Sequence, residues 1–257
     1  MTKDDEVFIS IVVVLTKFPH LIRHTLNSIA KQTFSSYEVL VITKRSEQQL
    51  VEIPKELGDK ARLFRLRDAS LGKLLNRGID KSKGKYIQFL QSGDAFLQPT
   101  GLDEIATSLK DQSVDLFYSA YIKREESVMY AKYKPFKVEG LRRGKLYTHL
   151  ESCVFLRKSL ISIGKFYSGL TYHPGLEILL RFFQDDKMTN IFVKKVFCDH
   201  EVKRKSPAEV FHEVAEIFWI LCKRVGIFQA IRWFFLQEHF HVYQWTKRML
   251  KKAFFRT

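Results

Sequence analysis

The hydrophobic positions of the first ninety residues switch between strand-like runs and helix-like spacing. Residues 7–15 are largely β-branched and apolar on both faces, which is typical of a central strand in a parallel sheet. Pro19 suits the first turn of a helix, and apolar residues then recur at helical spacing as far as Ala30. Three more strands and a second helix are predicted at 37–43, 61–66 and 85–90 and at 70–82. This order predicts an α/β domain.

A second block of alternating elements follows. It contains predicted strands and one predicted helix at 114–122, 152–157 and 190–199 and at 175–183. The basic stretch 203–207 breaks this pattern. Residues 203–257 hold eleven basic and four acidic residues, and all three tryptophans lie in this part of the chain. We therefore expect an α/β domain over residues 1–202 and a basic, aromatic-rich helical tail over residues 203–257.

The charge and the cysteine content limit the binding partners and the cellular compartment that can be expected. Lys and Arg number 43 against 28 Asp and Glu, a net charge of +15 that favours nucleic acid, phosphorylated small molecules or an acidic membrane face. The basic residues are spread along the chain without a recognisable nucleic-acid module, which disfavours nucleic acid. Three cysteines without a CxxC pair indicate neither a disulfide framework nor a zinc site. An acidic N-terminus and the lack of a run of about 18 apolar residues predict a cytoplasmic protein, soluble or peripheral on the membrane.

Polar loops follow three of the predicted strands, at residues 15–19, 43–48 and 91–94. Ligands of open α/β sheets bind outside the carboxyl ends of the strands, so these loops are the first places to look for a site. Gln91-Ser92-Gly93-Asp94 puts a carboxylate at a strand exit, where a hard divalent cation that bridges two phosphates needs oxygen ligands. Ser, Gly and Asp are also the commonest turn residues, and these four letters alone favour a simple turn.

The sequence around residues 91–94 favours a metal-binding role for Asp94 over a simple turn. Residues 68–94, DASLGKLLNRGIDKSKGKYIQFLQSGD, resemble the segment of family 2 glycosyltransferases that reads approximately N-x-G-I and then A-x-G-x-Y-I-x-F-L-D-x-D-D. The positions in register are Asn76, Gly78, Ile79, Gly84, Tyr86, Ile87, Phe89, Leu90 and Asp94. Residues 10–42 are similar to the family's first strand, helix and second strand, and residues 153–170 to its F-x-R-R-S-L…G-x-F segment. The resemblance covers about residues 8–185.

The resemblance implies a GT-A fold, which is Rossmann-like with a mainly parallel central sheet flanked by helices, here with a C-terminal helical extension. It also implies inverting transfer of a sugar from a nucleotide-diphosphate donor to an acceptor hydroxyl, in surface polysaccharide or lipopolysaccharide synthesis. Asp94 would hold Mn²⁺ or Mg²⁺ against the departing diphosphate. The positions expected to bind the donor are Thr16, Ser46, Asp68, Asn76 and Asp94.

Three departures from the family pattern fall in the two loops that follow the first and second strands and at the position of the general base. The acidic Asp-Asp-Gly-Ser after the second strand is Thr-Lys-Arg-Ser at 43–46, and the Pro-x-Tyr-Asn of the first loop is Val-Leu-Thr-Lys at 14–17. The register of the family's general base falls on Gly175, which has no side chain. A catalytically inactive GT-A-like protein that acts as a scaffold or binding partner is therefore the alternative to an enzyme.

Substitutes for the missing base lie nearby. Glu177 and His173 are the expected candidates, because a histidine titrates near neutrality and a carboxylate needs only to be ionised and in reach. An acidic residue in the first turn of a helix, such as Glu177, also stabilises the helix dipole, and this structural role is the alternative. His149 and Glu151 are weaker candidates.

The last thirteen residues have an amphipathic pattern. On a helical wheel one half of residues 245–257 is apolar with Trp245 and Phe254, and the other carries four Lys or Arg residues. Such a helix suits the surface of an anionic membrane and a lipid-linked or glycan acceptor. A helix that packs back on the domain with its basic face in water fits equally well.

Overall fold

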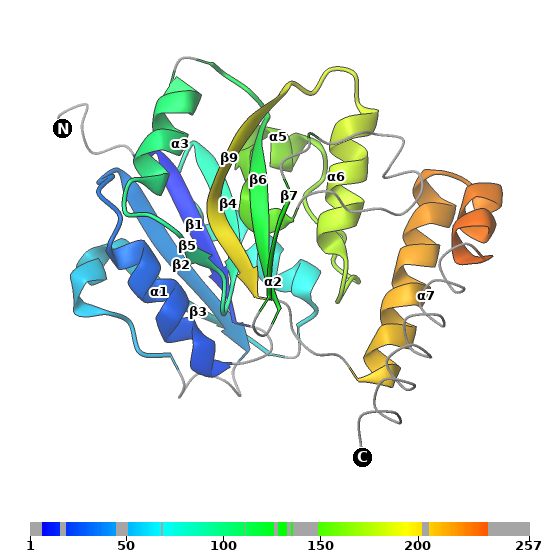
Figure 1. Cartoon of the computed structure of the whole chain (residues 1–257), viewed down its shortest axis with the longest axis horizontal. Coiled ribbons are helices and arrows are strands. Elements are labelled where there is room, and N and C mark those ends of the chain that lie inside the picture. The colour runs from blue at the N-terminus through cyan, green and yellow to red at the C-terminus, as the bar shows by residue number, and fades with distance from the viewer. Residues whose placement is uncertain are drawn as a thin grey trace.

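The described part of the chain forms a mixed sheet of nine strands between two layers of helices (Figure 1). The computed structural model describes residues 7–15, 19–44, 51–67, 69–110, 112–125, 128–132, 135, 149–201 and 206–235. This arrangement confirms the predicted α/β fold, with its helical extension on the right of Figure 1.

The first half of the sheet is parallel, as predicted. Its strands follow the order β3-β2-β1-β4, with β1 Ile9–Val14, β2 Tyr37–Lys44, β3 Ala61–Leu66 and β4 Tyr86–Gln91. β1 is buried along its whole length, because β2 and β4 lie on either side of it and helices cover both faces. The carboxyl ends of β1, β2 and β4 therefore share one edge of the sheet.

The second half of the sheet is mostly antiparallel. Its strands are β5 Ala95–Phe96, β6 Leu116–Glu125, β7 Val128–Lys132, β8 Cys153–Leu156 and β9 Asn190–Glu201. β8 runs antiparallel to both β4 and β6, and β7 pairs with β6 across a connection too short for a parallel crossover. β9 runs parallel to β6 and its last residues also pair with β5, so the end of β9 returns to the end of β4.

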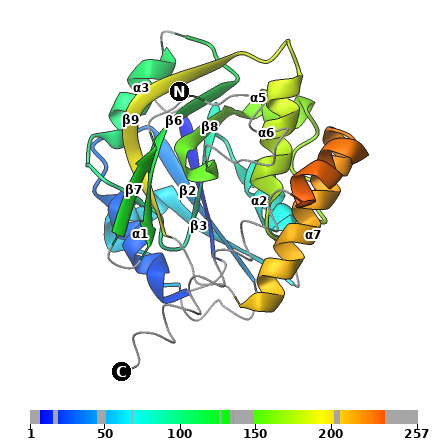
Figure 2. The same cartoon turned by 45° about the vertical axis from the view of Figure 1, so that its right-hand side comes forward.

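Helices cover the two faces of the sheet, which Figure 2 separates to left and right. On one face lie α1 Ile22–Ala30, which follows a 3-10 turn at Pro19–Leu21, and α3 Gly101–Lys110. On the other lie α2 Leu71–Lys81, α5 Arg157–Ser162 and α6 Pro174–Gln184. Short 3-10 segments, η3 Lys55–Lys60 and η4 Leu150–Ser152, complete the domain.

Asp115 ties three elements together at the start of β6. Its Oδ2 accepts hydrogen bonds of 2.8 Å from both the backbone N–H and the hydroxyl of Thr189, and its Oδ1 accepts one from Ser159 at the start of α5. Burial by itself raises the pKa of Asp115, but the hydrogen bonds from Ser159 and Thr189 outweigh it and hold this pKa below its usual value.

The C-terminal helix α7, Pro207–Arg224, begins at a capping box formed by Ser206 and Glu209. This helix confirms the predicted C-terminal helical extension, and its Phe211 is 72% exposed. A further helical segment follows at residues 227–235. Among the residues that the structure describes, no helix combines the length and apolarity needed to cross a membrane.

Polar contacts fix α7 to the domain. The carboxylate of Glu216 accepts hydrogen bonds from the backbone N–H groups of three consecutive residues, 171–173, just before α6. At the other end of α7, Arg224 forms an ion pair with Glu177 of α6. The backbone carbonyl of Arg224 also accepts a 3.0 Å hydrogen bond from Gln184 Nε2. The boundary between residues 202 and 203 stays a prediction, and residues 245–257 lie outside the described part of the chain.

Candidate functional site

Asp94 is fully buried in a turn fixed from two sides. Its Oδ2 accepts a 2.7 Å hydrogen bond from the backbone N–H of Gln91, which closes the turn at the end of β4. Gly93 has φ +104°, a conformation that favours glycine, and its N–H donates to Thr25 Oγ1 of α1 at 2.9 Å. Arg124 of β6 donates to the carbonyl of Gly93 at 2.9 Å. The carboxylate is thus held in one orientation before any ligand binds.

The end of β9 brings a histidine to this turn. Asp199 Oδ1 accepts a 3.0 Å hydrogen bond from the backbone N–H of Ala95 and thereby fixes the end of β9 against the residue after Asp94. The next residue, His200, lies with its Nδ1 3.0 Å from Asp94 Oδ1. No sequence motif surrounds His200, and the predicted strand ends one residue before it.

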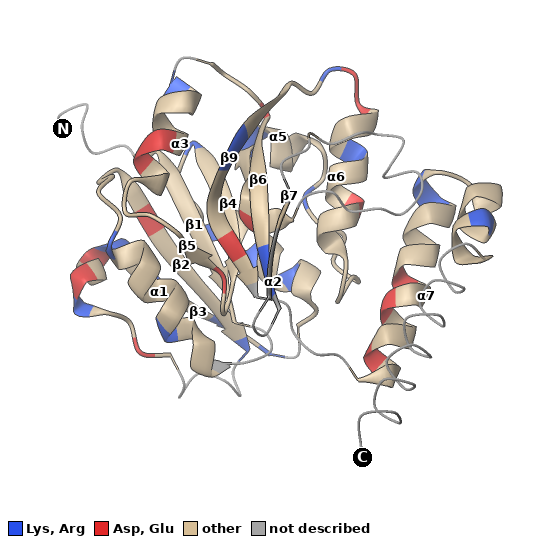
Figure 3. Cartoon of the chain, in the orientation of Figure 1, with Lys and Arg blue, Asp and Glu red and all other residues tan. Residues whose placement is uncertain are grey.

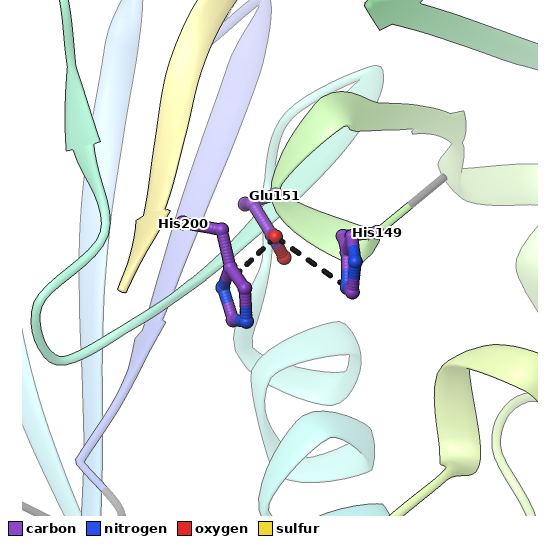
Figure 4. A group of neighbouring side chains, drawn as sticks. All are labelled: His149, Glu151 and His200. Carbon is purple, nitrogen blue, oxygen red and sulfur yellow. Dashed lines mark ion pairs between the residues drawn. The ribbon is translucent and has the colours of Figure 1, made fainter. Parts of the chain in front are cut away.

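A second buried carboxylate completes the cluster. Glu151 lies in η4, which is held to β4 because the backbone carbonyl of Glu151 accepts a 2.8 Å hydrogen bond from Gln88 Nε2. Its Oε1 is 2.9 Å from Nδ1 of His200 and 3.8 Å from Nδ1 of His149 (Figure 4). The two imidazole rings stack with centroids 4.7 Å apart. Two carboxylates and two imidazoles therefore meet at the end of β4.

The charged groups of this cluster shift one another's pKa. Burial raises the pKa of Glu151, the nearby Asp94 carboxylate raises it further, and His200 acts in the opposite direction. Burial by itself lowers the pKa of His200, but the Glu151 and Asp94 carboxylates outweigh it and raise this pKa to about 10. The cluster thus stabilises positive charge between the two carboxylates.

The chemistry of these donors fits a divalent metal ion. One ligand atom from each of His149, Glu151 and His200 lies within 4.8 Å of the others, and Asp94 Oδ1 adds a fourth beside His200. Mg²⁺ prefers oxygen ligands in a strict octahedron, whereas first-row transition ions also accept imidazole nitrogen. The mixed nitrogen and oxygen set therefore suits Mn²⁺ better than Mg²⁺.

Asn76, which was also expected to bind the donor, does not join this cluster. The amide of Asn76 on α2 bonds with both the N–H and the carbonyl of Phe166 at 2.9 Å, and so holds the loop after α5. Its role in donor binding stays a prediction. Thr16, Ser46 and Asp68 lie outside the described residues.

The two expected general bases lie on the side of α6 that faces α7. Glu177 is buried, with Oε2 bound by Arg181 Nε at 3.1 Å and Oε1 bound by Arg224 Nε at 2.8 Å. His173 precedes α6, and its Nε2 is 3.9 Å from a carboxylate oxygen of Glu213 on α7. These contacts are those of a structural network, and the catalytic role of both residues stays untested.

Gly175 shows why the family's base has no counterpart at its usual register. A Cβ atom at this position would lie 2.9 Å from Cγ of Leu150, closer than such atoms approach in proteins. The start of α6 therefore packs directly on η4, the segment that carries Glu151. Sequence reasoning placed Glu151 among the weaker candidates because nothing local indicates its contact with the end of β4.

The fold and the buried carboxylate turn after β4 define a GT-A type of domain. Residues 10–165 match the family described as Glycosyl transferase family 2, and this match covers more than half of the 257 residues. The chain belongs to this family.

Its relatives include proteins named as glycosyltransferases. An uncharacterized glycosyltransferase of Rickettsia typhi is 24% identical over 209 residues, which are 77% of this chain and 63% of the relative. A PGL/p-HBAD biosynthesis glycosyltransferase of Mycobacterium bovis is 27% identical over 104 residues, covering 38% of this chain and 41% of the relative. The chain thus spans less than two thirds of the length of these relatives.

Two solved structures show the same fold. The S. aureus TarS fragment 1–349 in complex with UDP-GlcNAc matches with a TM-score of 0.63 and 14% identity, covering 86% of this chain and 69% of that one. The mannosyltransferase PcManGT of Pyrobaculum calidifontis, in complex with GDP-Man and Mn²⁺, matches with a TM-score of 0.63 and 15% identity over 88% of this chain and 69% of that one. At these identities the likeness establishes the fold alone, and it confirms the predicted GT-A class.

Proposed function

We propose that this protein transfers a sugar from a nucleoside-diphosphate donor to the hydroxyl of a glycan or lipid-linked acceptor, with inversion, in the synthesis of a surface polysaccharide or lipopolysaccharide. The observation that carries the proposal is the cluster of Asp94, Glu151 and His200 at the carboxyl end of β4. Ligands of open α/β sheets bind at that edge. The names of the relatives and the nucleotide sugars bound by TarS and PcManGT support the same class of donor.

Each residue of the cluster has a proposed role. Asp94, Glu151, His149 and His200 would hold a divalent cation, which would neutralise the charge that develops on the departing diphosphate. Thr25 and Arg124 act through Asp94, because they fix the Ser92-Gly93-Asp94 turn in the orientation that directs its carboxylate toward His200. Glu177 and His173 remain the predicted general bases.

A catalytically inactive scaffold is the second candidate function. The specific observation in its favour is Gly175, which has no side chain at the family's usual register and where a Cβ atom would lie 2.9 Å from Cγ of Leu150. The two arginines that bind Glu177 add to it, because they occupy the substitute carboxylate. Such a protein would keep the GT-A fold and would not catalyse sugar transfer.

Thermal unfolding with nucleotide sugars separates the two candidates. We would measure the Tm of the full chain with UDP-, GDP-, dTDP- and CMP-linked sugars, each with Mn²⁺, with Mg²⁺ and with chelator. A donor at 100 times its Kd stabilises the folded state by about 2.7 kcal/mol, which raises the Tm of a chain of this size by roughly 5–10 °C. A shift with one donor that disappears with chelator supports the enzyme. No shift with any donor and either metal supports the scaffold.

We also propose that the protein works at the cytoplasmic face of the membrane. The net charge of +15 and the basic, aromatic sequence of residues 245–257 support attraction to anionic lipid. Deletion of residues 245–257 should then weaken the binding of the protein to anionic liposomes, and unchanged binding would contradict this role for the tail.

A further inference from the structure

The helical segment 227–235 presents an uncovered apolar face. Ile227, Phe228, Ile231 and Phe235 are 55%, 85%, 41% and 61% exposed. At about 100° per residue these four side chains occupy a continuous arc of roughly 100° on one side of the helix. The opposite side is buried, because Ala230 and Trp233 pack on Leu221 of α7. Monomeric proteins rarely expose large apolar side chains together without a function for them.

A short and well-defined link fixes the direction of this face. Val225 N–H and Gly226 N–H both donate to the carbonyl of Leu221, at 2.8 and 3.0 Å, and end α7. Gly226 has φ +112°, the left-handed conformation typical of a glycine that follows a helix. The next helix starts at once, and its buried side holds it against α7. The apolar face is therefore held in a fixed orientation and is directed away from α7.

The charges around this face are positive. The acidic residues of α7 are Glu209, Glu213 and Glu216, all within its first ten residues, and its last turn carries Lys223 and Arg224 (Figure 3). The described residues 217–235 carry three basic residues, Lys223, Arg224 and Arg232, and no acidic one. Arg232 is exposed beside the apolar arc. Apolar side chains bordered by cations fit a surface of anionic lipid headgroups over acyl chains.

The small size of the face argues against a second copy of the chain. A helix of nine residues is about 14 Å long and about 10 Å wide. A stable protein interface covers about 800 Å² on each partner, several times the area of this helix. A membrane sets no such minimum, because the bilayer surface is continuous and the gain grows with each apolar side chain that enters it.

We propose that residues 227–235 lie in the plane of an anionic membrane and insert Phe228 and Phe235 at the boundary between headgroups and acyl chains. This inference rests on the membrane association included in the proposed function, and it adds residues 227–235 to residues 245–257 as a membrane contact. Binding to vesicles requires no donor and no metal, so its failure is distinguishable from failure of the proposed sugar transfer.

The test is flotation of the full chain with vesicles of phosphatidylcholine containing 30% phosphatidylglycerol, and with vesicles of phosphatidylcholine alone, at about 0.1 M salt. The test variant is Phe228→Gln combined with Phe235→Gln, and both sites are exposed enough to accept Gln without unfolding. The matched control is Phe211→Gln, which removes a phenyl ring that is 72% exposed on the acidic half of α7. We expect the double variant to lose at least tenfold in affinity for the anionic vesicles and the control to stay within twofold of wild type.

Three results would overturn the proposal. One is a wild-type chain that does not float with anionic vesicles. Another is a double variant that binds as well as wild type, which would place the contact elsewhere, for example in residues 245–257. The third is a lipid-free dimer, seen by light scattering, that the double variant converts to monomer, which would assign the face to a second copy. The melting temperature of each variant shows that it is folded.

Discussion

Glu177→Ala would remove a buried carboxylate from between two guanidinium groups. Glu177 is 1% exposed, and each of its oxygens accepts hydrogen bonds from one arginine, Arg181 in the same helix and Arg224 at the end of α7. The substitution leaves both guanidinium groups without this carboxylate and removes the ion pair between α6 and α7. It therefore separates a structural from a catalytic role for this carboxylate.

The expected loss of stability follows from these surroundings. Removal of one partner from a buried ion pair costs roughly 3–5 kcal/mol. The loss should be near the lower end, because Arg224 is 27% exposed and Arg181 keeps its hydrogen bonds to the carbonyls of Ile163 and Lys165. We expect the free energy of unfolding to fall by about 3 kcal/mol and the Tm by roughly 6–12 °C. Arg224→Ala, which leaves Glu177 paired with Arg181, should cost about 1–2 kcal/mol.

Urea unfolding followed by circular dichroism measures this loss, and the rate of sugar transfer, with the donor that shifts the Tm, measures the chemistry. A structural Glu177 predicts lower stability with a kcat within about threefold of wild type. Loss of a general base instead lowers kcat by about 10²–10⁴. The reasoning is refuted if Glu177→Ala is as stable as wild type and its kcat falls a hundredfold. Glu104→Ala is the control, because its pair with Lys195 is exposed and should contribute less than about 1 kcal/mol.

Three further predictions concern packing, acid stability and thiol reactivity. Gly72→Ala should lower the free energy of unfolding by about 1–3 kcal/mol in urea, because its Cβ would lie 2.3 Å from the backbone oxygen of Tyr167; a gain in stability would contradict this packing. Asp115→Asn should cost about 1–2 kcal/mol at neutral pH. The pKa of Asp115 is lowered in the folded state, so the stability that its carboxylate contributes is present above about pH 3.9 and is lost as the pH falls through the folded pKa. Thermal melts of the variant and the wild type should therefore converge in acid. Burial raises the pKa of the Cys198 thiol, so alkylation of the native chain read by mass spectrometry should modify the half-buried Cys222 first, and early modification of Cys198 would be the opposite result.

The sequence predicted the parallel half of the fold because the signals there are local. Residues 7–15 are apolar on both faces, which requires cover on both sides, and Gly93 before Asp94 marks the turn that follows β4. Ser70, next to a helical run, marks the start of α2, and its hydroxyl accepts a hydrogen bond from the backbone of Lys73. The helix α3 at Gly101–Lys110 was not predicted.

The cluster could not be predicted, because it depends on contacts between distant segments. Asp94 and His200 are 106 residues apart, and their contact requires the register of β9 on β6, which shifts twice around Ala120. No local pattern encodes such irregularities. Glu151 lies in a single 3-10 turn, so its place beside His200 is decided by the packing of Leu150 on Gly175.

The central claim is that Asp94 holds the cation that binds the donor's diphosphate. The most direct test is isothermal titration of the donor that shifts the Tm into wild type and Asp94→Asn, with Mn²⁺ and with chelator. Asparagine keeps an oxygen that can accept the hydrogen bond from Gln91 but removes the charge. We predict donor binding by wild type that chelator abolishes, and an affinity at least tenfold lower in the folded Asp94→Asn variant. Equal Mn²⁺-dependent affinity in both proteins would contradict the claim and leave Asp94 a turn residue.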